Sequence, residues 1–400
     1  MNDEFTEPES RTPSKNGTSP HSSEWKLVLA TISADAEENQ RARLNSLLNS
    51  HRSVDWHSVL RIAEFHGTSS LLYQSLAPLG DAVPVQVLES LRQRYVVNVQ
   101  KSLFLARELT PILDCAHSLG IELISYKGLV LSEIYYGDIA MRPAGDIDLF
   151  VRKRDVIRIK SALRELGYVP SQQILEASEM DYLAAGYEYS FDGPAEKHLL
   201  ELQWDLQPRY YSVDYDMDDL FARAIQVTAA GRTLKILSPE DLLLVLSIHA
   251  AKHVWGRLIW LRDIAQILQR DLNFDSILAR ARELGIMRIL HVTLLLANRF
   301  LKMSIPAAIE PAISADRTAP AFAEELTPPI VAGISWEDYK MAYFRLMMRL
   351  RERRSDQLRF LTRLTFTPGP GEWQTLKLPR ALSPLYRAVR MARLAARFIR

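Results

Sequence analysis

The sequence predicts an α+β protein in which a mixed sheet with its own helices lies between two helical regions. Apolar residues recur at spacings of three and four over residues 25–119, which is typical of helices. Short apolar runs then alternate with helical segments and turns over residues 120–236, which predicts a small α/β core. The helical spacing returns over residues 237–400.

The composition is that of a globular chain without disulfides. The 400 residues are 48% hydrophobic, which leaves room for two or three domains and a sizeable core. Cys115 is the only cysteine, so an intramolecular disulfide framework and a four-cysteine zinc site are excluded, and a reducing cytoplasm fits. The longest apolar run, near residues 242–251, is too short to cross a bilayer. We therefore expect a cytoplasmic protein with no transmembrane segment.

The first part of the chain is expected to be a tail followed by helices. Residues 1–24 are polar and rich in Pro, Ser, Gly and Asn, which predicts a disordered tail without a signal peptide. Helical spacing then covers residues 42–48, 56–65 and 85–115. Pro111 is expected to kink the last of these helices or to begin a new one, because proline has no backbone N–H to donate.

The middle of the chain is expected to carry the sheet. Gly120 ends the preceding helix, and Asp192-Gly193-Pro194 marks a turn between two strands. The predicted elements are a strand at 121–126, a helix at 129–136 after the turn Lys127-Gly128, a strand at 146–151, a helix at 155–166, and strands at 187–191 and 198–204.

A strong helix start opens the last part of the chain. Ser238 is a suitable N-cap, Pro239 suits the first helical position, and Asp241 falls in the first turn. A helix is therefore expected to begin here and to run to Leu268, with several more helices after it.

The charge is uneven along the chain. The net charge is +1, but from Lys340 to the end fifteen Lys or Arg residues stand against three acids. In the last predicted helix, residues 383–400, a basic stripe is made by Arg387, Arg390, Arg393, Arg397 and Arg400. The stripe is either the solvated face of a docking helix or a contact for an anionic partner, such as an acidic protein, a nucleic-acid backbone or a membrane surface.

Asp146 and Asp148 begin an apolar strand and predict a cation site. Alternate residues of a strand point to the same face, so the two carboxylates lie side by side and repel each other unless a cation neutralises them. Mg²⁺ fits because it prefers oxygen ligands and keeps phosphate oxygens in its shell. Glu201, flanked by leucines in an apolar strand, is the best third ligand, since it is costly to bury alone. The alternative is that the two aspartates only start a strand, with one of them capping a turn.

Lys127, Gly128 and Arg142 add groups that suit a phosphate. A glycine at a strand-to-helix turn lets a phosphate approach the N–H groups of the helix N-terminus, and Lys127 would hold it as a point charge. Arg142 would clamp a phosphate, pair with the aspartates, or pair on the surface of its loop. With the three acids, these residues predict an enzyme that moves a phosphorus-containing group, with two Mg²⁺ ions at the attacking and leaving oxygens.

These residues resemble the DNA polymerase β-like nucleotidyltransferase superfamily, whose pattern is a glycine-containing turn, then Asp-x-Asp, then an acid on a later strand. More closely, the chain is similar to a bacterial family of uncharacterised nucleotidyltransferases through Lys127-Gly128, Arg142, Asp146-Ile147-Asp148-Leu149 and Glu201-Leu202-Gln203-Trp204. The resemblance implies transfer of a nucleoside monophosphate from an NTP to an acceptor hydroxyl or phosphate, with release of pyrophosphate. It implies that the three acids bind Mg²⁺ and that Lys127, Gly128 and Arg142 bind the triphosphate.

Two residues depart from these patterns. Leu129 stands where the superfamily usually has a serine, and Gln203 stands where the closer family has a histidine. An alternative function is therefore a catalytically inactive nucleotide-binding module with a regulatory or scaffolding role.

His249 and His253 are four residues apart and share a face of a predicted helix, with Lys252 beside them. They are expected to pack at the interface with the core, to contact the nucleotide or the acceptor, or, as a third alternative, to bind zinc. Asp263, further along, is expected to pair with Arg257 or Arg262.

Overall fold

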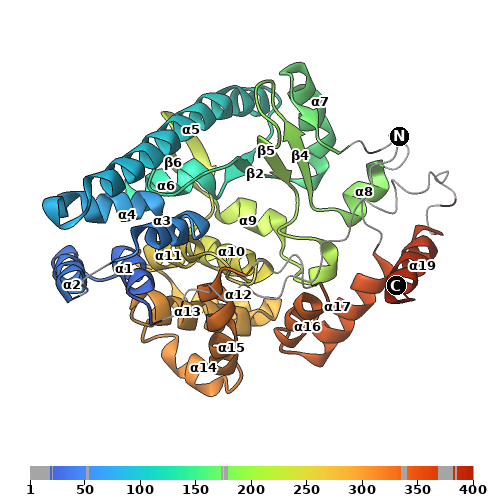
Figure 1. Ribbon diagram of the computed structural model, residues 1–400. Helices are drawn as coiled ribbons and strands as arrows, with labels where there is room; N and C mark the ends of the chain where they lie inside the picture. Colours follow the sequence, from blue (N-terminus) through green and yellow to red (C-terminus); the bar gives the residue numbers. More distant parts are fainter. Residues whose placement is uncertain are drawn as a thin grey trace.

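The computed structural model describes residues 19–399 except 20, 51–53, 173, 175–178, 335–339, 368–381, 383 and 384. Most of the expected tail lies outside these residues, and the first helix begins at Ser23. The N-terminal part is helical, and its last helix is the long rod along one side of the molecule in Figure 1. The bounds are α1 Ser23–Thr31, α2 Glu37–Ser50, α3 Trp56–Phe65, α4 Ser69–Leu76 and α5 Val85–Ser118.

Helix α5 passes through Pro111 without ending, so the expectation of a new helix there is wrong, while a kink stays a prediction. The proline removes the helical hydrogen bond to the carbonyl of Arg107. Leu109 and Ile112, on either side of it, are buried in a core shared with the sheet. Tertiary packing therefore holds the helix together where local preference would break it.

Within the described residues, seven strands form one mixed sheet in the order β3-β4-β5-β2-β1-β7-β6, which confirms the α+β class. Strand β2 pairs antiparallel with β1 and parallel with β5. The strands are β1 Leu123–Ser125, β2 Ile147–Val151, β3 Val169–Pro170, β4 Glu188–Asp192, β5 Leu200–Gln203, β6 Ile225–Ala229 and β7 Arg232–Ile236. The helices of this part are α6 Gly128–Tyr136, α7 Val156–Glu165, α8 Glu179–Ala185 and α9 Met217–Arg223.

The hairpin of β6 and β7 was not expected from the sequence. Its two-residue turn, Ala230-Gly231, has positive φ angles of 52° and 69°. Such turns usually carry Asn-Gly or Asp-Gly, and Ala-Gly gives no comparable signal. Strand β7 then pairs parallel with β1, beside the strand that leads to Lys127.

The rest of the described chain is helical, as expected. Its helices are α10 Pro239–Lys252, α11 Leu258–Ile267, α12 Phe274–Leu284, α13 Met287–Leu301, α14 Glu310–Ala315, α15 Ala319–Ala332, α16 Lys340–Arg349, α17 Arg354–Phe366 and α19 Tyr386–Ile399. Throughout the described part of the chain, every helix is too short or too polar to traverse a bilayer.

Helix α10 begins as predicted but ends earlier. The Ser238 hydroxyl accepts a hydrogen bond from the N–H of Asp241, as an N-cap should. The helix does not reach Leu268, because Val254 and Trp255 have positive φ angles. Both are fully buried, so packing of Val254 and of the large Trp255 ring holds this break, just before Gly256.

Helix α19 packs on α17, where Arg390 Nε donates to the carbonyl of Leu364 at 2.9 Å. Arg390 is thus a packing contact as well as a member of the predicted basic stripe. The side chains of Arg397 and Arg400 lie outside the described part of the chain. An anionic partner for this helix stays a prediction.

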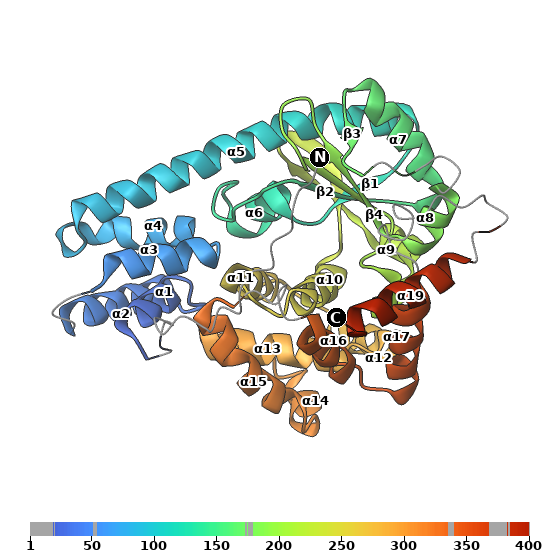
Figure 2. The same ribbon diagram turned by 45° about the vertical axis from the view of Figure 1, so that its right-hand side comes forward.

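The two faces of the sheet look onto different cores. Ile147 and Leu149 are buried in a cluster with α5 and α7, whereas Phe150, on the other face, belongs to the cluster of the C-terminal helices. Figure 2 shows α5 and α7 on one side of the sheet and α10 and α11 on the other. Strand alternation therefore aims Asp148 at the helical region.

The proline in α5 provides a stability test. Pro111→Ala is expected to raise the free energy of unfolding by about 1–3 kcal/mol, because alanine restores the hydrogen bond to Arg107 and favours the helix. Urea denaturation measures the change. The control, Pro84→Ala, alters an exposed proline just before α5 and is expected to lower stability by no more than about 1 kcal/mol through the unfolded chain. An unchanged or lower stability for Pro111→Ala would contradict the expectation.

Candidate active site

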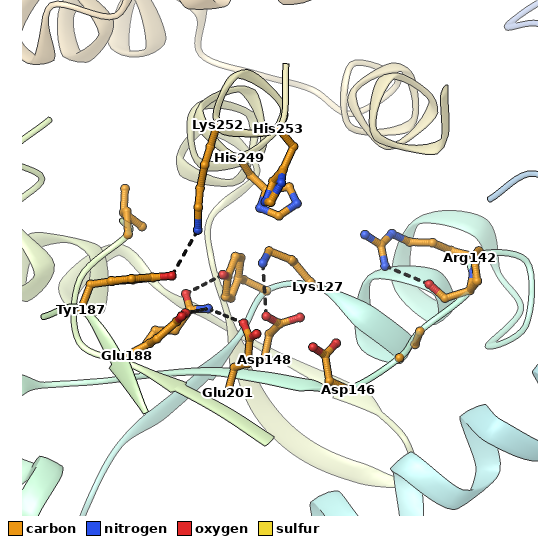
Figure 3. A pocket seen from close by; sticks show the side chains of 16 residues that line it. Lys127, Arg142, Asp146, Asp148, Tyr187, Glu188, Glu201, His249, Lys252 and His253 are labelled. Atoms are coloured by element: carbon orange, nitrogen blue, oxygen red, sulfur yellow. Dashed lines mark hydrogen bonds and ion pairs between the residues drawn. The ribbon is translucent and has the colours of Figure 1, made fainter. Parts of the chain in front are cut away.

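A pocket of about 380 Å³ opens between the sheet and helix α10, and Figure 3 shows the side chains that line it. The sequence-predicted residues that it gathers are Lys127, Arg142, Asp146, Asp148, Glu201, His249, Lys252 and His253. They come from the turn after β1, from the loop before β2, from β2 and β5, and from the end of α10. Gly128 is buried beside the pocket and does not line it.

Asp146, Asp148 and Glu201 converge on one point of this pocket. One carboxylate oxygen from each lies within 4.8 Å of the others. Strands β2 and β5 run parallel with Asp148 opposite Glu201, so the two side chains leave the sheet on the same face. Asp146 stands immediately before β2, two residues from Asp148, and continues the row.

Burial and the proximity of the acids shift the pKa of two of them. Burial, followed by the negative charge of Asp148, raises the pKa of Asp146 to about 6 and that of Glu201 to about 8. Three crowded carboxylates are a hard oxygen donor set whose ionised forms repel one another. The residues therefore fit a divalent cation such as Mg²⁺, which would neutralise them.

Lys127 is the nearest cation to this cluster. Its Nζ lies 3.2 Å from Asp148 Oδ1 in a buried ion pair. Burial opposes its charge, but the attraction of Asp148 outweighs this and raises the pKa of Lys127. The lysine stays charged and is held at the floor of the pocket, where a phosphate group would meet it.

Gly128 supports the site from behind. Its φ of +62° is unfavourable for other residues, and a Cβ placed there would lie 3.3 Å from the carbonyl oxygen of Asp146. The glycine thus allows the start of α6 to pack closely on the residue before β2.

Arg142 has a different partner from those expected. Its Nε donates to Asp263 Oδ2 on α11 at 2.9 Å, and the Tyr136 hydroxyl donates to Asp263 Oδ1 at 2.7 Å. Arg142 and Asp263 are both buried. The expected pairing of Asp263 with Arg257 or Arg262 is therefore wrong, because the loop before β2 packs against α11. Arg142 lines the pocket as part of a fixed wall.

The end of α10 forms the opposite wall. The ring centroids of His249 and His253 lie 4.8 Å apart. The Trp260 ring packs against both, with its centroid 5.4 Å from that of His249 and 5.3 Å from that of His253. Burial and the charge of Lys127 lower the pKa of His249 well below its usual range. His253 is open to solvent through the pocket, yet surrounding protein and the Lys252 charge lower its pKa to about 3. Both rings are therefore neutral near pH 7.

Lys252 extends this wall towards the edge of the sheet. Its Nζ lies 3.3 Å from the Tyr187 hydroxyl and 4.9 Å from the centre of the Tyr187 ring. Burial lowers the pKa of Lys252 despite the nearby Glu188.

Sequence reasoning missed Tyr187 and Glu188 as pocket residues. Glu188 lies opposite Gln203 across the antiparallel pair of β4 and β5. Burial raises its pKa, as it does for Asp146 and Glu201. An acid in the predicted strand 187–191 was a usable signal, but only the pairing of that strand with the strand of Glu201 shows that it belongs here.

An α+β fold with three acids gathered beside a buried lysine at a strand-to-helix turn is typical of nucleotidyltransferases. Residues 52–302 match a family described as uncharacterised nucleotidyltransferases, and the chain belongs to this family. A crystal structure of an antigenic nucleotidyltransferase-like protein from Paracoccidioides brasiliensis is similar at 16% identity and a TM-score of 0.30, over 51% of this chain and 94% of that one. No curated protein matches the chain.

The buried pair between the loop and α11 predicts a large stability effect. Asp263→Asn leaves the Arg142 guanidinium buried without a counter-charge and is expected to cost about 3–5 kcal/mol of unfolding free energy. Glu325→Gln, in the exposed pair with Arg349, is the control and is expected to cost no more than about 1 kcal/mol. Denaturant unfolding of both variants measures the difference, and equal losses would show that Arg142 does not depend on Asp263.

The raised pKa of Glu201 predicts a pH dependence in the absence of divalent metal. Between its ordinary value of 4.5 and about 8 the folded chain holds a proton that the unfolded chain has lost, so stability falls as the pH rises through this window. Glu201→Gln removes this loss, and its stability relative to the wild type should rise by up to about 1.4 kcal/mol per pH unit. Thermal unfolding in EDTA at several pH values tests this. A constant difference between the two proteins would refute the raised pKa.

Proposed function

We propose that the protein is a Mg²⁺-dependent nucleotidyltransferase that moves a nucleoside monophosphate from an NTP to an acceptor hydroxyl or phosphate. The observation that carries this proposal is the convergence of Asp146, Asp148 and Glu201 within 4.8 Å. Family membership supports the reaction class. The resemblance of the core to the polymerase β superfamily, a bacterial source and a cytoplasmic location belong to the same proposal.

In this proposal the three acids hold two Mg²⁺ ions, as in other two-metal sites. When bound, the metal supplies positive charge to the triphosphate and to the attacking oxygen. Glu201 lies on the β4 side of the cluster, towards Glu188, and would accept the proton of the acceptor hydroxyl. The acceptor oxygen bonds to the α-phosphorus, the bond to the bridging oxygen breaks, and pyrophosphate leaves.

Lys127 would bind the triphosphate. Its buried ammonium is already aimed at the cluster, so a phosphate oxygen that replaces Asp148 as its partner needs only a small movement. Gly128 would contribute by placing the N-terminus of α6, which favours negative charge, behind the same group. Arg142, fixed by Asp263, would add positive charge to the wall without acting as a mobile clamp.

His249, Lys252 and His253 would contact the nucleotide or the acceptor from α10. The neutral imidazoles of His249 and His253 suit hydrogen bonding and stacking, whereas Lys252 suits a polar or anionic group. The acceptor itself, of small-molecule, peptide or protein nature, would enter between the sheet and this helix.

The central test replaces one shared ligand. Asp148→Asn is expected to reduce Mg²⁺-dependent pyrophosphate release by at least about a thousandfold, since it removes charge from the reacting centre while keeping the side-chain shape. Each NTP is incubated with cell lysate as the source of acceptor, and released pyrophosphate and the labelled product are measured. Asp271→Asn, at an exposed position between α11 and α12, is the control and should leave the rate unchanged.

Two outcomes contradict the proposal. Turnover that survives in Asp148→Asn would show that the reaction does not depend on the acid cluster. NTP binding with Mg²⁺ but no product with any acceptor would instead support the alternative of an inactive nucleotide-binding module with a regulatory or scaffolding role.

A further inference from the structure

Two uncharged side chains, Tyr126 and Gln203, connect the acid cluster to the centre of the sheet. The Tyr126 hydroxyl lies 2.7 Å from Gln203 Oε1, and Gln203 Nε2 lies 2.9 Å from Glu201 Oε2. The two residues are 5% and 3% exposed, so water does not compete for these bonds. Neither has a role in the reaction proposed above, yet both line the pocket.

The chemistry of the groups gives this chain of hydrogen bonds one direction. With a cation bound, Glu201 is ionised and its Oε2 can only accept, and Glu188 Oε2 makes a longer contact of 3.4 Å with the same amide nitrogen. The NH₂ group of Gln203 must therefore face the two acids, which leaves its oxygen to accept from Tyr126. Burial raises the pKa of Tyr126 well above its usual range, so the hydroxyl keeps the proton that it donates.

Tyr126 is itself held in place. Its ring stacks on Phe150 with centroids 4.1 Å apart and planes at 19°, and Lys127 Nζ lies 4.6 Å from the ring centre. Phe150 is fully buried in β2, two residues beyond Asp148. The position of the Gln203 amide is thus set by the same strand that carries the aspartates.

We propose that Tyr126 and Gln203 are positioning residues that hold Glu201 Oε2 and thereby turn its other oxygen towards Asp146 and Asp148 as a cation ligand. The inference rests on the proposed function only in taking the three acids as a divalent-cation site. An amide suits this task because it fills one oxygen without adding charge. A lysine at the same position would compete with the cation, and an aliphatic residue would leave a buried carboxylate oxygen unpaired.

The same amide separates Glu188 from the cluster. Glu188 lies near Tyr187 and Lys252 on the α10 side of the pocket. Gln203 stands between this group and Glu201, so three of the four acids in the pocket are assigned to the cation and the fourth to the opposite wall.

We call the hydrogen-bonded chain from Tyr126 through Gln203 to Glu201 the relay. Binding of Mn²⁺ alone to the full chain, measured from the electron paramagnetic resonance of the free ion, tests the relay without turnover. Gln203→Leu is expected to weaken Mn²⁺ binding by about tenfold or more, the effect typical of groups that orient metal ligands. Tyr126→Phe keeps the stacked ring and should weaken binding in the same direction by a smaller factor. Tyr168→Phe is the matched control, since its buried hydroxyl donates to Glu108 at 2.9 Å outside the pocket, and should leave Mn²⁺ affinity unchanged.

Thermal unfolding of each variant separates positioning from folding. A lower melting temperature with unchanged Mn²⁺ affinity, measured where the variants are folded, would overturn the proposal and leave a structural role only. If Gln203→Leu does not fold, Tyr126→Phe decides. Weakened Mn²⁺ binding in a chain that releases no pyrophosphate would support the relay and reject the transferase, whereas pyrophosphate release with unaltered Mn²⁺ affinity would reject the relay alone.

Discussion

The candidate site depends on the parallel, in-register pairing of strands β2 and β5. This pairing sets Asp148 opposite Glu201, and strand alternation brings Asp146 into the same row. The raised pKa values of Asp146 and Glu201 show that the carboxylates are held together against burial and mutual repulsion. The opposing stabilisation comes from the other face of the strands, where the alternating apolar residues are buried under α5 and α7. A slip of one residue would turn the acids into that core, so the register of the core is also the register of the site.

The sheet supplies only half of the pocket, and the helical region supplies the rest. The loop before β2 is tied to α11 by the buried pair of Arg142 and Asp263, and α10 places Lys252 and two histidines above the acids. The start of α10 is fixed by the Ser238 cap, and its end by the buried Trp255. The position of the pocket's far wall is therefore decided by packing within the helical region, which couples the stability of that region to the geometry of the site.

The sequence was sufficient for the features that depend on local pattern. The strands that carry Asp148 and Glu201, and the helix start at Ser238, follow from alternation, an acid in an apolar run and a cap. The features that it could not predict depend on contacts between distant segments. The partner of Arg142 lies 121 residues away, and the continuity of α5 at Pro111 comes from packing on the sheet. Strand β7 was missed because its turn lacks the usual residues, although it lies beside β1.

Under the proposed function, the charges of the pocket side chains couple the binding of the cation to the binding of the nucleotide. Of the described residues, four acids line the pocket against two lysines, while Arg142 is already paired and the α10 histidines are neutral. When these acids are ionised, the pocket carries net negative charge and would repel a free nucleoside triphosphate. A divalent cation among the acids would reverse the sign of that interaction, and it would compete with Lys127 for Asp148 and so leave the ammonium to meet a phosphate. Under the proposed function, cation and nucleotide must therefore strengthen each other's binding by the same factor, since such coupling is reciprocal. Under the proposed function, a pocket with four acids therefore binds the nucleotide as its metal complex.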